Sequence, residues 1–299
     1  MTNRGMADQI QSPIQRPVLS TVPARPRRRF PFGGIAFYGT IGFFAINLIL
    51  LVATVVIDSF GHSWFRTLLP TGFTTDWYTA LTQDHDMGTL LINTFMVAIT
   101  TTALALLIGF PAAYVLARKQ FRLKGVLTAL LLLPMLIPSL VYGIPLATLL
   151  LSLDLGGSLI GIILINLVPI VPFVILILTP FIEQVDLSLE SASRMLGAGR
   201  LRTFRKIVLP LVVPGLLTAG VLAVVRTIAA FELTYLVATT GNSQTLVTAL
   251  YGDFTGAGIR AHQETSAMAV VYMVFTMAFV VVALIFVKPT QFVVRIKAK

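Results

Sequence analysis

Ionisable residues inside the long apolar stretches of this chain are the first candidates for chemistry. Arg226 and Glu232 are the only Asp, Glu, Lys or Arg residues within such a stretch. Buried charges in a membrane are costly, so they usually face a cavity or a partner. On one helix these two side chains would point about 120° apart, so we do not expect them to pair. Together with the polar Asn166, they are candidates for lining a pathway for a polar solute.

The other reactive residue types form no catalytic set. The sequence has no cysteine, which excludes a disulfide scaffold and a thiolate nucleophile. His62, His85 and His262 lie in predicted external loops without metal-ligand spacing, and His85 is expected at a solvated loop tip. There is no G-x-x-x-x-G-K-[ST] phosphate loop and no G-x-S-x-G elbow. We therefore expect no catalytic residue, no metal site and no nucleotide hydrolysis by this chain itself.

Six apolar stretches must position these side chains. Of 299 residues, 56% are hydrophobic and 11% are charged, whereas about 25% are charged in an ordinary soluble domain. Roughly 20 helical residues cross a bilayer core, in which backbone polar groups must pair internally. The sequence therefore predicts an all-α integral membrane protein with a domain over residues 35–287. Its six expected transmembrane helices are Ile35–Ile57, Leu90–Ala117, Gly125–Leu151, Gly156–Ile182, Pro210–Ala238 and Ala267–Val287.

Basic residues gather in four segments between or beyond these stretches. Residues 1–34, 118–124, 183–209 and 288–299 hold 19 of the 22 Lys and Arg residues. Because basic loops stay in the cytoplasm, both termini are expected to be cytoplasmic. The net charge of +10 then indicates topology and contact with membrane lipids, not nucleic-acid binding. The first segment, which is also rich in proline, is expected to be a disordered tail, and the last a short basic tail.

The longest of the internal basic segments, residues 183–209, carries a pattern of its own. Asp186 is a residue type that starts helices, and small and apolar residues follow it at helical spacing. Gly197 and Gly199 can take a positive φ and end that helix in a sharp turn. A second, basic turn follows, and Pro210 is expected to begin the next span. On spacing alone, this helix–turn–helix is either a docking element for a partner or a plain amphipathic linker.

The same segment resembles the signature loop of permease subunits of binding-protein-dependent ABC importers, which reads roughly E-E-A-A-x-x-L-G-A and continues into I-x-L-P. The matching residues are Glu190, Ala192, Leu196, Gly197, Ala198, Ile207, Leu209 and Pro210. Two positions depart from the signature, since Ser191 replaces its second glutamate and Ser193 its second alanine. The resemblance implies the type I ABC importer permease fold, with residues 183–209 as the loop that couples to an ATPase. It also implies that Glu190 contacts the ATP-binding subunit.

The resemblance extends to partners and location. It implies two ATP-binding subunits that carry ATP and Mg²⁺, so that no cofactor is expected in this chain. It further implies a periplasmic solute-binding protein and a second permease subunit, a sister chain in preference to a copy of this one. The expected location is the bacterial inner membrane. The alternative, which would have no ATPase partner, is a secondary transporter or channel.

The substrate is the least specified part of the resemblance. The stretch Phe231–Val237 and the L-G form of the signature look similar to the spermidine/putrescine branch of the family. A polyamine or a related organic amine or opine is therefore the expected solute. Glu232, near the outer end of its predicted span, would suit a cationic amine and is expected at the outer gate.

Overall fold

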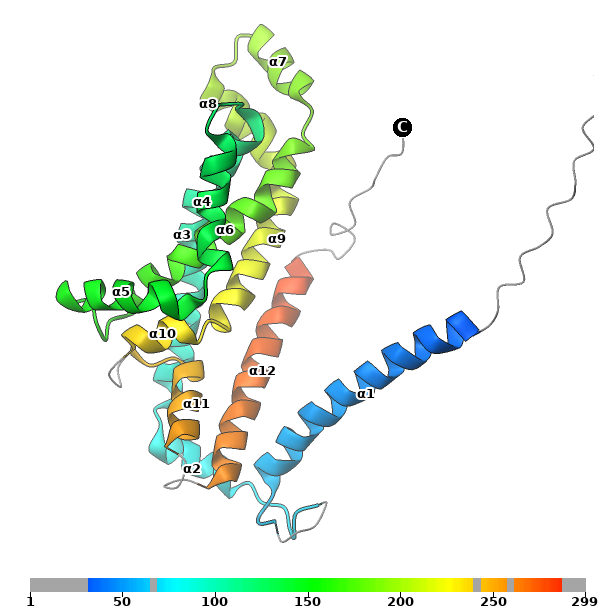
Figure 1. The fold of residues 1–299 in the computed structure, drawn as a ribbon, viewed down its shortest axis with the longest axis vertical. Coiled ribbons are helices and arrows are strands. Elements are labelled where there is room, and N and C mark those ends of the chain that lie inside the picture. The colour runs from blue at the N-terminus through cyan, green and yellow to red at the C-terminus, as the bar shows by residue number, and fades with distance from the viewer. Residues whose placement is uncertain (1–31, 65–68, 239–242, 257–260, 287–299) are drawn as a thin grey trace, which may run out of the picture. The chain divides into compact units, whose positions relative to one another are not determined.

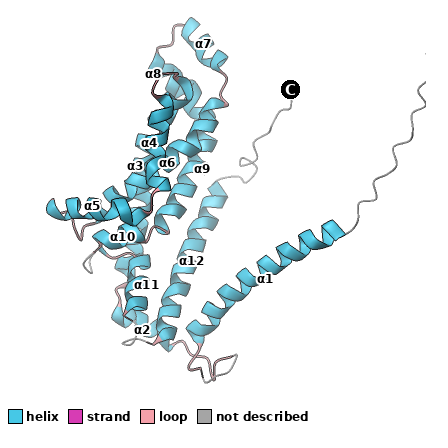
Figure 2. Ribbon diagram, viewed as in Figure 1, coloured by secondary structure: helices cyan, strands magenta, loops and turns pink. Residues whose placement is uncertain are grey.

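The computed structural model describes residues 32–64, 69–238, 243–256 and 261–286. The regular elements there are helices (Figure 2), and one isolated bridge joins Gly61 to Phe73. The predicted tails lie outside the described residues, except that helix α1 (Phe32–Phe60) already begins at residue 32. The chain divides within α1 into residues 1–50 and residues 51–299. The second part contains all the candidate site residues.

Five helices in the described part of the chain are long and apolar enough to cross a membrane, and a bent pair is a sixth candidate. The five are α1, α3 (Met87–Arg118), α6 (Leu159–Glu183), the continuous run of α8 (Arg200–Thr203), η1 (Phe204–Val208) and α9 (Leu209–Ile228), and α12 (His262–Phe286). The bent pair is α4 (Lys124–Leu136) and α5 (Ser139–Ser152), which meet at 92°. The predicted all-α membrane architecture is confirmed, with the third expected span broken in two.

The break between α4 and α5 has a local cause at Pro138. Proline has no amide hydrogen and pushes the residue before it out of the helical region. Ile137 accordingly has φ −86° and ψ 137°, and Pro138 itself has ψ 133°. By contrast, α6 contains three prolines and still continues as one helix. A proline in a predicted span is therefore not sufficient for a break.

The fifth expected span, Pro210–Ala238, is placed wrongly by the sequence pattern. The helix begins ten residues earlier, at Arg200, and ends at Ile228. It passes through a π-helical turn in which the Leu209 amide donates to the Phe204 carbonyl. Such a turn shifts the hydrogen-bond spacing, so that Pro210 is accommodated without starting a new helix. Two short helices follow, α10 (Glu232–Val237) and α11 (Leu246–Thr255).

Helices α3, α6 and α9 pack along one another and form the main core. Glycines permit this close approach. A Cβ on Gly109 of α3 would lie 2.8 Å from Val174 Cγ1 of α6, and one on Gly215 of α9 would lie 2.6 Å from Phe181 Cγ of α6. Small residues at helix crossings are the usual means of tight packing in membranes. Figure 1 shows α7 (Leu187–Met195) and α8 at one end of this frame, and α5 and α10 lying across it.

Candidate functional site

Residues 183–209, called the coupling loop below, form the predicted helix–turn–helix at one end of the core (Figure 1). Asp186 caps α7 by accepting a 2.8 Å hydrogen bond from the Ser188 amide. The hydrogen bonds from Ser188 hold the pKa of the Asp186 carboxyl below its ordinary value. Gly197 has φ +82°, as expected of a turn glycine, but Gly199 has an ordinary φ of −66°. Only the first of the two glycines therefore makes the turn.

One face of the coupling loop is open. Met195 and Leu196 at the end of α7 are 83% and 88% exposed. The small residues Ser191 and Ala192 are exposed as well, and Ala198 is half-buried. Large apolar side chains that gather on an exposed projection mark an interaction surface. Ser193 differs from its neighbours, because it is buried and its hydroxyl lies 3.0 Å from the Thr203 hydroxyl of α8.

Glu190 points into the chain and not toward this open face. It is 4% exposed, and its Oε1 lies 2.8 Å from Nε of Arg118, the last residue of α3. The Tyr114 hydroxyl donates a 2.8 Å hydrogen bond to Glu190 Oε2. Residues of its own chain therefore surround the Glu190 carboxylate, whereas the sequence predicts a contact with an ATP-binding subunit. Sequence reasoning missed Arg118 and Tyr114, which no spacing rule connects to a loop so far along the chain.

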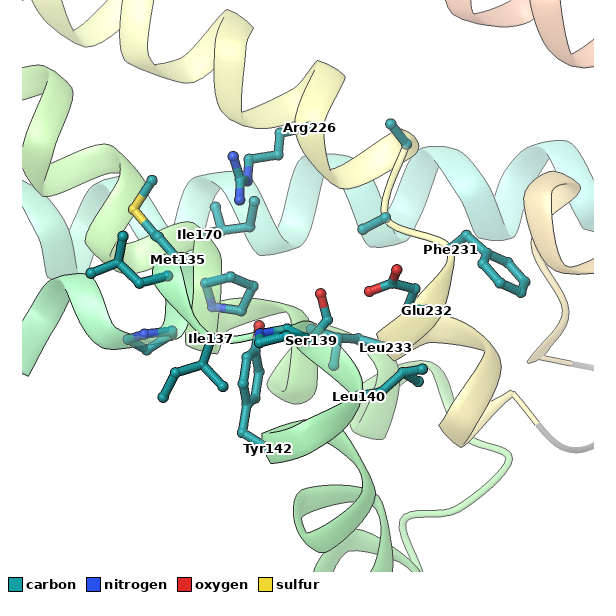
Figure 3. Close-up of a pocket in the computed structure, with 16 residues that line it drawn as sticks. Met135, Ile137, Ser139, Leu140, Tyr142, Ile170, Arg226, Phe231, Glu232 and Leu233 are labelled. Carbon is teal, nitrogen blue, oxygen red and sulfur yellow. The ribbon is translucent and has the colours of Figure 1, made fainter.

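A cavity of about 620 Å³ lies where two helix breaks meet, between α4 and α5 and between α9 and α10. Arg226 in the last turn of α9 and Glu232 at the start of α10 both line it (Figure 3). The prediction that they share one helix is wrong, since that helix ends at Ile228. No ion pair between them is found among the described residues. The Arg226 guanidinium instead lies 4.9 Å from the centre of the Phe173 ring.

The remaining polar candidates have structural contacts. Asn166 is completely buried and is not among the lining residues of the cavity. Its Nδ2 donates to the Ile162 carbonyl at 2.8 Å and to the Thr234 hydroxyl at 3.0 Å, so it joins α6 to α10. The expected solvated position of His85 is also wrong, because its Nε2 lies 3.0 Å from Asp253 Oδ2 of α11 and its side chain is mostly buried.

Comparison with known proteins identifies the group to which this architecture belongs. Residues 105–289 match the family described as the binding-protein-dependent transport system inner membrane component. The chain belongs to this family. The permease is 30% identical over 219 residues to the trehalose transport system permease protein SugB of Mycobacterium tuberculosis (strain CDC 1551 / Oshkosh), covering 73% of this chain and 79% of that protein. It is 28% identical over 176 residues to the spermidine/putrescine transport system permease protein PotC of Escherichia coli (strain K12), covering 59% and 64%.

A solved structure supports the same fold. The crystal structure of a bacterial ABC transporter involved in the import of the acidic polysaccharide alginate matches the permease with a TM-score of 0.68 and 21% identity, covering 87% of this chain and 97% of that one. The family and the fold confirm an ABC importer permease, in which ATP hydrolysis belongs to partner subunits. A secondary transporter or channel without an ATPase is therefore set aside. Relatives named for trehalose and for spermidine/putrescine leave the solute open.

Proposed function

We propose that this permease forms half of the translocation pathway of an ATP-driven importer in the bacterial inner membrane. The observation that carries the proposal is the coupling loop, which projects from one end of the core with Met195 and Leu196 almost fully exposed. Burying such a surface in a groove of another protein is favourable in proportion to its apolar area. The partner that fits is a cytoplasmic ATP-binding subunit, because the basic charge of the loop and of both tails favours the cytoplasmic side.

The assembly proposed for this permease has two-fold organisation. Each of two ATP-binding subunits engages one coupling loop, so a second permease is needed, and we propose a sister chain. A periplasmic solute-binding protein delivers the solute on the opposite side. When the two ATP-binding subunits close on ATP, two coupling loops move together and favour one of two arrangements of the helix bundle. The exposed Ser191, Ala192, Met195 and Leu196 and the adjoining Ala198 form the contact surface in this proposal.

The cavity at the two helix breaks is proposed as part of the pathway. Broken helices present unpaired backbone groups and helix ends to a solute, as in other transporters. Arg226 and Glu232 add one charge of each sign, and Ser139 and Tyr142 add hydroxyl groups to the lining. A small organic amine, such as a polyamine or an opine, would place its ammonium group near Glu232. A carboxylate of the same solute would suit Arg226, which favours the opine within this class.

The docking proposal is tested by purifying the permease from a membrane that contains the whole transport system. We expect a phosphate-loop ATPase to co-purify with the wild type and to be lost with Leu196→Asp, which puts a charge into the apolar contact. Phe73→Asp is the matched control, since Phe73 is 72% exposed and lies outside the coupling loop. Retention of the ATPase by Leu196→Asp, or its absence from the wild-type preparation, would refute the proposal.

A further inference from the structure

An ion pair joins the buried face of the coupling loop to the end of α3, and the docking surface does not explain its role. Arg118 and Glu190 have side chains that are 8% and 5% exposed, and their nearest charged atoms are 2.8 Å apart. The contact between Arg118 Nε and Glu190 Oε1 is an ion pair, because its geometry is not that of a hydrogen bond. Burial of two charges does not by itself stabilise a fold, because desolvation offsets most of their attraction. A specific orientation is the better-supported use of such a pair.

Two further bonds fix that orientation. The Tyr114 hydroxyl, one turn before Arg118 on α3, donates to Glu190 Oε2 at 2.8 Å. Arg118 Nη2 donates to the Val185 carbonyl at 2.7 Å, just before α7 begins. The end of α3 therefore holds α7 at two points, the Glu190 carboxylate and the backbone carbonyl of Val185 just before the helix. We call Tyr114, Arg118 and Glu190 the α3–α7 clamp.

The chain connections of α7 do not by themselves transmit a displacement to the core. Residues 184–186 link α7 to α6, and residues 196–199, which include two glycines, link it to α8. Short irregular links of this kind absorb changes in φ and ψ, as hinges do. The α3–α7 clamp bypasses both links. Its other end is α3, which packs along both α6 and α9, two of the helices that line the cavity.

Aromatic packing extends the clamp to the start of the next span. The Phe204 ring lies 5.1 Å from the Phe110 ring and 5.3 Å from the Tyr114 ring, between centroids. The Ser193 and Thr203 hydroxyls, 3.0 Å apart, join α7 to α8 beside it. The ends of α3, α7 and α8 are therefore packed into one block.

We propose that Arg118 and Tyr114 are positioning residues that bind Glu190 and make α7 and α3 move as one unit. The inference rests on the proposed function, since a load on α7 must come from an ATP-binding subunit. In this account Glu190 transmits motion inside the permease, and the contact with the ATPase is made by the exposed residues of the loop.

This chain has no native cysteine, so paired spin labels can be placed in it and measured in a complex whose partner subunits have had their cysteines replaced. Labels at Lys119→Cys and Ser188→Cys, two exposed positions on either side of the clamp, report the distance between α3 and α7. We expect this distance to be the same in nucleotide-free and ATP-bound complexes. With Arg118→Met, we expect the distance distribution to broaden and to depend on nucleotide. A distance that changes with nucleotide in the wild-type background would overturn the proposal.

Solute transported per ATP hydrolysed is the second readout, which a merely structural role would not move. Arg118→Met should lower it about tenfold, within the usual range of coupling between distant sites. Arg118→Lys, which keeps a positive charge and can donate to the Val185 carbonyl, should retain more of it than Arg118→Met, and Arg122→Met, an exposed basic control, should not change it. Tyr114→Phe carries the test if Arg118→Met assembles poorly. If Arg118→Met or Tyr114→Phe transports as much solute per ATP as the wild type, the clamp proposal is overturned and the proposed function stands. If no ATPase is present in the wild-type complex, the proposed function is overturned as well.

Discussion

The turn after α7 depends on the backbone freedom of one residue. Gly197 has φ +82°, and a Cβ added there would meet no atom within 4 Å. The cost of Gly197→Ala is therefore conformational, about 1–2 kcal/mol for an L-residue in the left-handed region. Since about 1.4 kcal/mol corresponds to a factor of ten, the ratio of native to altered turns should fall roughly tenfold. ATP-driven uptake by proteoliposomes that contain equal amounts of assembled complex follows the fraction of native turns, so it should fall by up to about tenfold.

Gly199 provides a matched control for this substitution. It lies two residues along the same turn, an added Cβ would again meet nothing within 4 Å, and its φ is −66°. Gly199→Ala should therefore leave uptake unchanged. Gly197→Asn should be less harmful than Gly197→Ala, because asparagine enters the left-handed region more readily. Equal effects of the two alanine substitutions, or none from Gly197→Ala, would refute the assignment of the turn to Gly197.

Three other substitutions test separate parts of the structure. Gly215→Ala places a Cβ 2.6 Å from Phe181 Cγ, and overpacking of this kind costs about 1–3 kcal/mol, so the midpoint of thermal unfolding should fall. Its control is Gly220→Ala, whose nearest contact is 3.4 Å away, and equal midpoints would contradict the close packing of α6 and α9. Glu232→Gln should lower uptake of an amine about tenfold or more while ATP hydrolysis continues, and unchanged uptake would remove Glu232 from the pathway. Asp186→Ala should speed amide exchange in the first turn of α7, whereas Asp186→Asn keeps a capping oxygen and should not. Because the pKa of Asp186 is lowered, its contribution to the cap is complete at neutral pH and is lost only as the pH falls through that lowered pKa. Protection of these amides that varies between about pH 6 and 8 would therefore contradict the assignment.

The all-helical membrane architecture could be predicted from the sequence because apolar runs of membrane length have few alternatives to helix. The breaks could not, since an apolar run has the same composition whether straight or bent. Pro138 ends α4, yet Pro169 and Pro172 leave α6 continuous, so the presence of a proline in an apolar run does not predict where that run breaks.

The candidate site was predictable in the same partial way. The cap at Asp186 and the turn at Gly197 follow from local residue preferences, and both are confirmed. The partners of Glu190 could not be found locally, because Tyr114 lies 76 residues earlier in the chain. The cost of charge in an apolar stretch predicts Arg226 and Glu232 as site residues, and both line one cavity. They lie on two helices, however, where the sequence pattern predicts one.

The most direct test of the central claim is a cryo-EM reconstruction of the intact transport complex with and without bound ATP. The account requires α7 to be enclosed in a groove of an ATP-binding subunit in both states, with Met195 and Leu196 covered. An α7 that remains exposed to solvent in every nucleotide state would contradict it.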